Sequence, residues 1–296
     1  MTKKMDRMLD LLMVPPGKKI DLLKDYDPGF VGQFMAKDDA ERAGAGGIRL
    51  LAEQQDKLYA QDNYSVLIVL QAMDAAGKDS TIKHVMSGVN PQGVEVTNFT
   101  EPSTEELDHD YLWRTFKALP RKGMIGIFDR SHYEEVLVVR VHPEFLDRQH
   151  LPPHLKGKDI WARRYEEINC FEQYLANNGI VVLKFFLNVS KNEQKKRFLE
   201  RVDDREKNWK FYAADIRERG RWNEYMDAYE NMLNATSTLH APWYIIPADH
   251  KWFARLAVTS AINRALDRLK LAYPQSSEEE KKALLTAKKE MENEDP

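Results

Sequence analysis

The stretch SVLIVLQAMDAAGKDST, residues 65–81, determines how the rest of the chain is interpreted. A short apolar run at 66–70 leads into small residues and then into Gly77-Lys78. A buried parallel strand that ends in such a turn and is followed by a helix is how proteins hold phosphate chains. Backbone N–H groups and the positive end of the helix face the anion, and the lysine adds a mobile charge. The sequence therefore predicts a phosphate site at the end of this strand.

The loop itself departs twice from the pattern G-x-x-x-x-G-K-[ST]. Ala72 stands where the first glycine would be, and Asp79 follows the lysine where a hydroxyl would ligate magnesium. Because carboxylate oxygen is a hard ligand suited to Mg²⁺, Asp74 inside the loop is the candidate replacement. Taken alone, the segment fits a strand-to-helix turn with a surface lysine and aspartate equally well.

A second apolar strand, expected at 124–128, delivers Asp129 to the carboxyl edge of the sheet, where ligands of open α/β folds bind. A carboxylate held at this edge by a rigid strand is typical of phosphoryl-transfer sites. The alternative is an Asp that caps the following helix. Arg130 is placed to contact the transferred phosphate, or else to form an ion pair with Asp129 or a surface glutamate. The two motifs together, in this order, favour phosphoryl transfer.

Together with the strand at 124–128, strands are expected at 65–71, 94–99, 180–187 and 243–246. They alternate with helices expected at 37–61, 78–89, 104–118, 159–178, 191–203, 220–236 and 252–272. A further helix is expected to begin near Tyr133. This alternation predicts a five-stranded parallel sheet with helices on both faces. Together with the phosphate loop after the first strand, it leads us to expect a P-loop nucleotide-kinase-like three-layer sandwich with a helical lid. Residues 1–274 would form one domain that begins with a turn-rich arm at 1–35. The charged tail at 275–296 would form a solvated helix.

The segment 191–221 contains eleven Lys and Arg residues against seven acids. Arg197, Arg201 and Arg205 recur every fourth residue and share one helix face. In nucleotide kinases a basic segment at this place closes over the phosphates as a lid, and arginine binds phosphate oxygens bidentately. The alternative is a solvated helix with ion pairs one turn apart.

Composition excludes several other classes of protein. The 296 residues are 43% apolar and 31% charged with a net charge of −3, which gives no overall attraction to nucleic acid or to an anionic membrane. Cys170 is the only cysteine, so no disulfide forms within the chain, and a cytoplasmic location is expected. We recognise no signal peptide, membrane span or zinc motif.

From about residue 20 to 272 the sequence resembles the family-2 polyphosphate kinases. The resemblance rests on Leu23-Lys24-Asp25-Tyr26-Asp27-Pro28, Asp74-Ala75-Ala76-Gly77-Lys78-Asp79, Gly88-Val89-Asn90-Pro91-Gln92-Gly93, Leu112-Trp113-Arg114, Phe128-Asp129-Arg130-Ser131-His132-Tyr133, and Glu193-Gln194 with Arg197-Phe198 and Arg201. It accounts for both departures in the loop, because the D-A-A-G-K form is the family's own. It implies phosphoryl exchange between inorganic polyphosphate and nucleotides, reversible and Mg²⁺-dependent, with Mn²⁺ as a substitute.

The resemblance also implies roles for particular residues. Asp74 and Asp129 would hold the metal, Lys78 and Arg130 would bind the reacting phosphates, and Arg197 and Arg201 would reach in from the lid. The remaining implied contacts are Ala75, Ala76, Gly77, Asp79 and Ser80 with phosphate, Lys83 and Lys210 with polyphosphate, and Pro102, Arg114, Tyr133 and Glu134 with the nucleotide.

The sequence Ser131-His132-Tyr133 followed by Glu134-Glu135-Val136 resembles members that accept both AMP and ADP, with ATP as a product. Guanine nucleotides stay open as acceptors, and a homodimer or homotetramer is implied. Two rivals remain at this point. One is an ATP-dependent kinase of a nucleoside monophosphate or another small molecule, and the other is a non-catalytic nucleotide or polyphosphate sensor.

Overall fold

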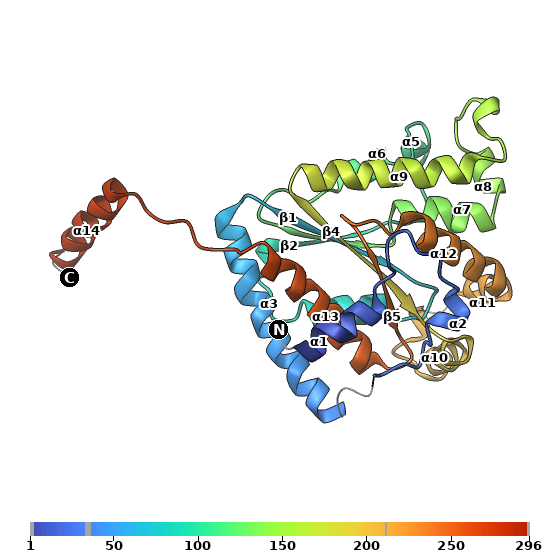
Figure 1. The fold of residues 1–296 in the computed structure, drawn as a ribbon, viewed down its shortest axis with the longest axis horizontal. Helices are drawn as coiled ribbons and strands as arrows, with labels where there is room; N and C mark the ends of the chain where they lie inside the picture. The colour runs from blue at the N-terminus through green and yellow to red at the C-terminus, as the bar shows by residue number, and fades with distance from the viewer. Residues whose placement is uncertain (1–2, 33–36, 211, 295–296) are drawn as a thin grey trace.

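Five parallel strands form one sheet through the middle of the protein in a computed structural model that describes residues 3–32, 37–210 and 212–294 (Figure 1). The strands are β1 (Ser65–Gln71), β2 (Val94–Asn98), β3 (Ile125–Asp129), β4 (Ile180–Asn188) and β5 (Trp243–Pro247), in the order β2-β3-β1-β4-β5. Every residue of β1 is buried, as expected for the central strand of a parallel sheet. Since β1 pairs with β3 on one side and β4 on the other, the connections reverse at its carboxyl end.

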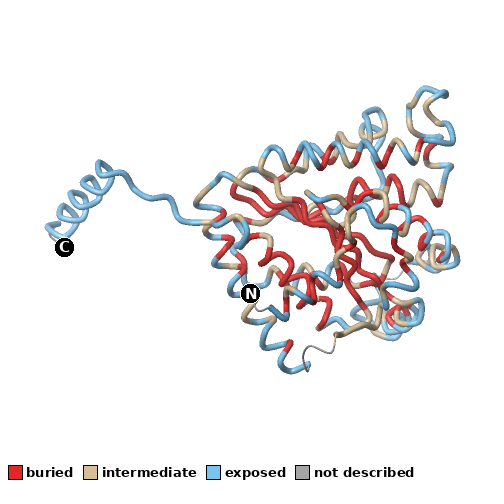
Figure 2. Tube along the Cα trace, viewed as in Figure 1, coloured by how far each residue is buried: buried red, intermediate tan, exposed pale blue. Residues whose placement is uncertain are grey.

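Helices cover both faces of this sheet, and the buried residues concentrate between the layers (Figure 2). On one face lie α1 (Lys3–Leu12), α3 (Lys37–Gln61), α4 (Lys78–Val85) and α13 (Lys251–Arg268), and on the other lie α9 (Ile160–Asn177), α12 (Trp222–Thr236), α6 (Trp113–Lys117) and α7 (Val138–Val141) (Figure 1). Helix α13 packs against α3, α4, α1 and the strands, which explains why twelve of its eighteen residues are buried. The predicted three-layer α/β architecture is confirmed.

The remaining elements are short helices near the sheet's carboxyl edge and in loops. They are α2 (Leu22–Asp25), α5 (Thr104–Leu107), α8 (Glu144–Asp147), α10 (Lys191–Asp203), α11 (Ala213–Gly220), and 3-10 turns at Pro91–Gly93, His132–Val136 (η2), Pro153–Leu155 and Asn208–Lys210. The predicted bounds of α3, β1 and α10 match those observed.

The helix predicted at 104–118 is wrong, because the structure breaks it into α5 and α6. The side chain of Asp110 accepts a hydrogen bond from the backbone N–H of Leu112, and this local turn competes with a continuous helix. After β3 the chain likewise forms the 3-10 turn η2 before α7, instead of one helix from Tyr133. Helices α4 and α13 end earlier than predicted, at Val85 and Arg268.

The N-terminal arm contains a helix that the sequence analysis missed. In α1, the side chains of Met8, Leu9 and Leu12 are buried against the core. An isolated helix of this length is unstable in water, so packing against α13 and β5 stabilises it. Beyond α1, Met13 bridges Tyr244, which covers the outer edge of β5.

The C-terminal tail forms α14 (Glu278–Glu292), as predicted, and has no buried residue. Ser277 and Glu280 form a capping box at its start. Figure 1 shows α14 standing away from the body of the protein at the end of an extended linker. Within the described ranges, none of the helices combines the length and the apolar character that crossing a bilayer requires.

Candidate functional site

The loop after β1 has the backbone shape of an anion site. Ala75 and Gly77 adopt left-handed conformations, with φ of +61° and +107°. Alternation of left-handed and ordinary residues turns successive N–H groups toward one side, and α4 begins directly afterwards with its positive end facing the same space. The Lys78 side chain is largely buried at this point, 9% exposed, and its charge lowers the pKa of Asp129 against the rise caused by burial.

The end of β3 joins this loop through Arg130. The Arg130 backbone N–H donates to the carbonyl of Leu70, and its guanidinium is 3.1 Å from Oδ1 of Asp74. Arg130 has a φ of +62°, a strained value for a non-glycine residue that is typical of functional sites. Burial lowers the pKa of Arg130, but the carboxylates of Glu134, Asp74 and Asp129 outweigh burial and raise it.

Asp129 offers a carboxylate with room for a cation. Its pKa is raised first by burial and further by the charge of the neighbouring Asp79 carboxylate. Its Oδ1 atom is buried and, within the described part of the chain, has no hydrogen-bond partner. An unpaired buried carboxylate oxygen beside a second carboxylate fits Mg²⁺, which takes one or two protein carboxylates and completes its shell with water and phosphate.

This cation site differs from the expected one in its partners. Asp74 is hydrogen-bonded to Arg130, and Asp79, not Asp74, is the carboxylate whose charge acts on Asp129. Across residues 3–32, 37–210 and 212–294, no group of three or more His, Cys, Asp or Glu side chains is arranged to hold a metal. That result agrees with the small number of protein ligands that Mg²⁺ uses in kinases.

Glu134 lies close to Arg130 and lines the neighbouring cavity. Burial raises its pKa, while Arg130 and Lys78 act in the opposite direction and Gln71 donates a hydrogen bond to it. The Gln71 amide also donates to Oγ of Ser131 at 3.1 Å, so the end of β1 supports the turn that presents Glu134. Glu134 therefore connects the phosphate loop to the cavity.

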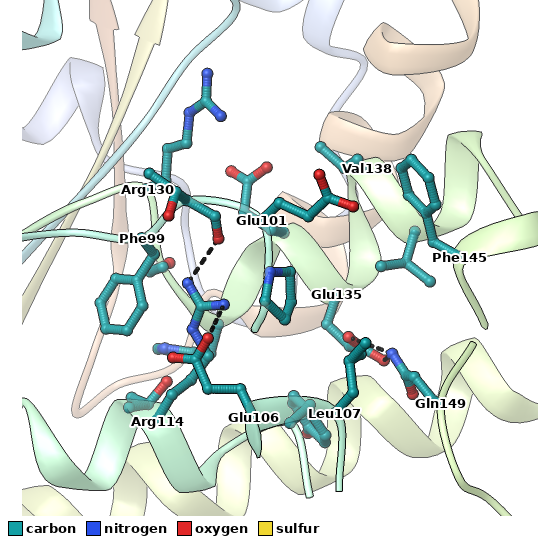
Figure 3. A pocket seen from close by; sticks show the side chains of 18 of the residues that line it. Phe99, Glu101, Glu106, Leu107, Arg114, Arg130, Glu135, Val138, Phe145 and Gln149 are labelled. Carbon is teal, nitrogen blue, oxygen red and sulfur yellow. Dashed lines mark hydrogen bonds and ion pairs between the residues drawn. The ribbon is translucent and has the colours of Figure 1, made fainter. Parts of the chain in front are cut away.

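A cavity of about 240 Å³ opens beside Arg130, between the loop after β2 and the segment that follows β3 (Figure 3). The residues on its wall that matter here are Phe99, Pro102, Arg114, Arg130, Glu134 and Phe145. Arg114 donates to the carbonyl of Thr100 and lies over the ring of Phe99, which holds the wall in place. Apolar rings with a few convergent charges are typical of a nucleotide pocket.

Three of the four predicted nucleotide-binding residues, Pro102, Arg114 and Glu134, line this cavity. Tyr133 does not, because its side chain is fully buried in the core and donates a hydrogen bond to Glu172 at 2.6 Å. The 3-10 turn η2 points Tyr133 and Glu134 in opposite directions.

The two predicted lid arginines have different positions. Arg197 is 5% exposed and donates to the carbonyls of Ala75, Ala76 and Ala248, so it packs behind the phosphate loop. Arg201 lies nearer the cleft, 3.9 Å from Asp215 of α11. Both arginines lie on α10 one turn apart, as the spacing predicted, but they have different neighbours. Arg205 does not share their helix face, because α10 ends at Asp203.

Among the predicted phosphate contacts, Ala75, Ala76 and Gly77 form the loop, and Ser80 donates its hydroxyl to the Gly77 carbonyl at 3.0 Å. Lys83 is exposed on α4. Lys210 lies in the 3-10 turn Asn208–Lys210, and its side chain is outside the described part of the structure.

Two further residues near the site, Asp215 and Gln194, had no role assigned from the sequence. Burial raises the pKa of Asp215, and the nearby carboxylate of Asp74 raises it further, which places Asp215 beside the site. Gln194 donates to the Asp74 carbonyl at 2.9 Å. Both lie in the segment 191–221, for which the sequence prediction considered only the Lys and Arg residues.

Comparison with known proteins agrees with this geometry. The family model described as polyphosphate kinase 2 matches residues 35–274. The chain is similar to an ADP-polyphosphate phosphotransferase of Rhodopseudomonas palustris, 46% identical over 94% of this chain and 96% of that protein. It is also similar to an AMP/ADP-polyphosphate phosphotransferase of Meiothermus ruber, 45% identical over 86% and 91% of the two chains. The crystal structure of polyphosphate kinase 2 from Arthrobacter aurescens superimposes with a TM-score of 0.84 at 39% identity, covering 94% of this chain and 96% of that one.

Proposed function

Because the chain belongs to the polyphosphate kinase 2 family, we propose that it transfers a phosphoryl group from inorganic polyphosphate to both AMP and ADP in a reversible, Mg²⁺-dependent reaction. The observation that carries this proposal is the position of Arg130. It contacts Asp74 of the phosphate loop and also lines the cavity, so one side chain faces both the donor and the acceptor sites.

The residues present can perform this transfer by positioning and charge alone. The nucleotide occupies the cavity with its phosphate toward Arg130, and the polyphosphate end rests on the N–H groups of the loop and on Lys78. The acceptor oxygen then attacks the terminal phosphorus in line. The bond from that phosphorus to the bridging oxygen breaks, and the polyphosphate, one phosphate shorter, leaves as the anion. Arg130 and Lys78 offset the charge that spreads over the phosphoryl oxygens. A bound Mg²⁺, held by Asp129 with Asp79 or Asp74, would supply further charge neutralisation and orient the phosphates.

Acceptance of AMP as well as ADP rests on Glu134. Its carboxylate lines the cavity beside Arg130, where the sugar of a nucleotide with a short phosphate chain would come to rest. A carboxylate there accepts hydrogen bonds from ribose hydroxyls. The name of the Meiothermus relative, which includes both acceptors, supports the same conclusion.

The test uses purified protein with polyphosphate, Mg²⁺ and AMP, and no ATP. ADP should appear first and ATP afterwards, as measured by ion-exchange chromatography. Parallel reactions with ADP, GMP and GDP measure the preference for the base. An ATP-dependent small-molecule kinase would form no product in this mixture, and a sensor would bind nucleotide without turnover.

A further inference from the structure

Helix α10 contacts three consecutive carbonyl groups of the phosphate loop. Gln194 Nε2 donates to the Asp74 carbonyl at 2.9 Å. Arg197 Nη1 donates to the carbonyls of Ala75 and Ala76 at 3.1 and 2.7 Å. Gln194 and Arg197 are one helical turn apart, and both are at least 95% buried.

These bonds control the direction of the loop's N–H groups. A peptide unit is planar and trans, so the N–H of each following residue points opposite to the carbonyl. When α10 holds the carbonyls of Asp74, Ala75 and Ala76 on its own side, the N–H groups of the next residues turn toward the anion site. The left-handed conformation of Ala75 is strained without such external support.

Gln194 is itself held by the second half of the lid segment. Arg219 of α11 donates to Oε1 of Gln194 and to the carbonyl of Lys191, both at 2.7 Å. Because a guanidinium only donates, it fixes the amide with its oxygen toward α11 and its NH₂ toward Asp74. Helix α11 therefore reaches the phosphate loop through one amide group.

We propose that Gln194 and Arg219 form a latch that couples docking of α11 to the shape of the phosphate loop, and that both are positioning residues. This inference rests on the proposed phosphoryl transfer. When α11 is docked, the Gln194 amide is locked and the Asp74 carbonyl is held. When α11 leaves, the amide is free to rotate and the loop relaxes, so the anion site is complete only under a closed lid.

Asp215 gives the same helix a second contact with the site. It precedes Arg219 by one turn of α11 and faces Arg201 at 3.9 Å. Docking of α11 therefore positions Arg201 and locks Gln194 in one movement.

The experiment compares Arg219→Gln with Arg217→Gln, which changes the same residue type at an exposed position of the same helix. Steady-state transfer from polyphosphate to ADP gives kcat and KM, and hydrogen exchange measures protection of residues 72–80 in the intact protein. We expect Arg219→Gln to lower kcat about tenfold to a hundredfold, the range for a small misplacement at a reacting centre, with faster exchange in the loop. Arg219→Lys, which still donates to Gln194, should recover most of the turnover.

Gln194→Glu is the second variant. Its carboxylate still accepts from Arg219, but it no longer donates to the Asp74 carbonyl. It should lower kcat as Arg219→Gln does, and the double variant should be no worse than either single one, because the two residues act as a unit.

The latch is refuted if the wild-type protein transfers phosphate while Arg219→Gln matches Arg217→Gln in kcat and in loop exchange. It is also refuted if the effects of the two single variants simply add. Failure of the wild-type protein to transfer phosphate is a different result, and it would overturn the proposed function instead.

Discussion

Two lysines near carboxylates show how the same pair of charges can serve stability or chemistry. Lys184, in the middle of β4, is completely buried, and its Nζ donates to Glu172 at 2.6 Å, Tyr133 at 2.9 Å and the carbonyl of Thr236 at 2.6 Å. These bonds use all three of its donors. Lys78, at the mouth of the phosphate loop, faces Asp129 and Glu134 through charge alone, and within the described residues no hydrogen bond holds its side chain.

The difference between the two lysines lies in hydrogen bonding more than in burial. Burial lowers the pKa of Lys184, and Glu172 raises it again, which is the pattern of a sealed ion pair. Around Lys78 the charges are close but incompletely bonded, and Asp129 keeps an unpaired oxygen. Charged groups at an open sheet edge that lack hydrogen-bond partners can bind a ligand. A buried ion pair whose hydrogen bonds are all made contributes only to the stability of the fold.

We call Lys78, Asp129, Arg130 and Glu134 the open cluster. The comparison fails if these residues stabilise the fold and do not take part in phosphoryl transfer. Asp129→Asn and Arg130→Ala should each nearly abolish transfer, with a loss of about 10³–10⁵ in kcat, the cost of a missing arginine in related phosphoryl transfers. Their thermal unfolding should match the wild-type protein, because the Arg130–Asp74 pair is partly exposed to solvent and Asp129 keeps an unpaired oxygen. Near-normal turnover in either variant, or a large loss of stability, would contradict the assignment.

The sealed cluster, which consists of Lys184, Glu172, Tyr133 and the carbonyl of Thr236, should respond in the opposite way: a substitution there should lower stability and leave turnover unchanged. Lys184→Met removes the ammonium that neutralises the buried Glu172 carboxylate, which should cost about 3–5 kcal/mol of unfolding free energy and lower Tm on the order of 10 °C. Turnover per folded molecule should stay close to that of the wild-type protein, as measured on the soluble fraction below Tm.

The matched control for the sealed cluster is the double variant Lys184→Met with Glu172→Gln. Removing both charges should recover a substantial part of the lost stability, because no uncompensated charge remains. If Lys184→Met unfolds no more easily than the wild-type protein, the cluster does not stabilise the core as described.

The open cluster could be predicted from sequence, whereas the sealed one could not. The strand-loop-helix pattern at 65–81 and the strand that ends at Asp129 have local signatures. The register that places Leu70 opposite Asp129 follows once both strands lie in a parallel sheet. Lys184 is a single charged residue in an otherwise apolar strand, and its partners come from other segments of the chain, so no local pattern indicates them.

The direction of individual side chains was the least predictable feature. Periodicity placed Arg197 and Arg201 on one helix face, but how α10 docks decides that Arg197 packs behind the loop while Arg201 lies near the cleft. Tyr133 and Glu134 are neighbours in sequence, yet the 3-10 turn sends one into the core and the other toward the cavity. Such outcomes depend on tertiary packing, which a local pattern does not encode.

Glu134→Gln tests whether Glu134, within the open cluster, acts on the choice between AMP and ADP. Removing this charge should lower turnover of AMP by about tenfold relative to ADP, because one hydrogen bond to a charged group is worth about 1.5 kcal/mol. The measurement is the ratio of kcat/KM for the two acceptors, with stability as the control. Equal losses for AMP and ADP would assign Glu134 to general phosphate chemistry and not to the choice of acceptor.

The smallest effect belongs to the C-terminal helix. A deletion after Tyr273 removes α14, whose residues are all exposed and which makes no buried contact with the sheet or the site. A helix that contributes neither a buried ion pair nor a charged group near the cleft should affect neither stability nor turnover. Tm and kcat for ADP should therefore stay unchanged within error. A drop in kcat at constant Tm would show that α14 reaches the cleft, and the division of function between the two lysine clusters would then be incomplete.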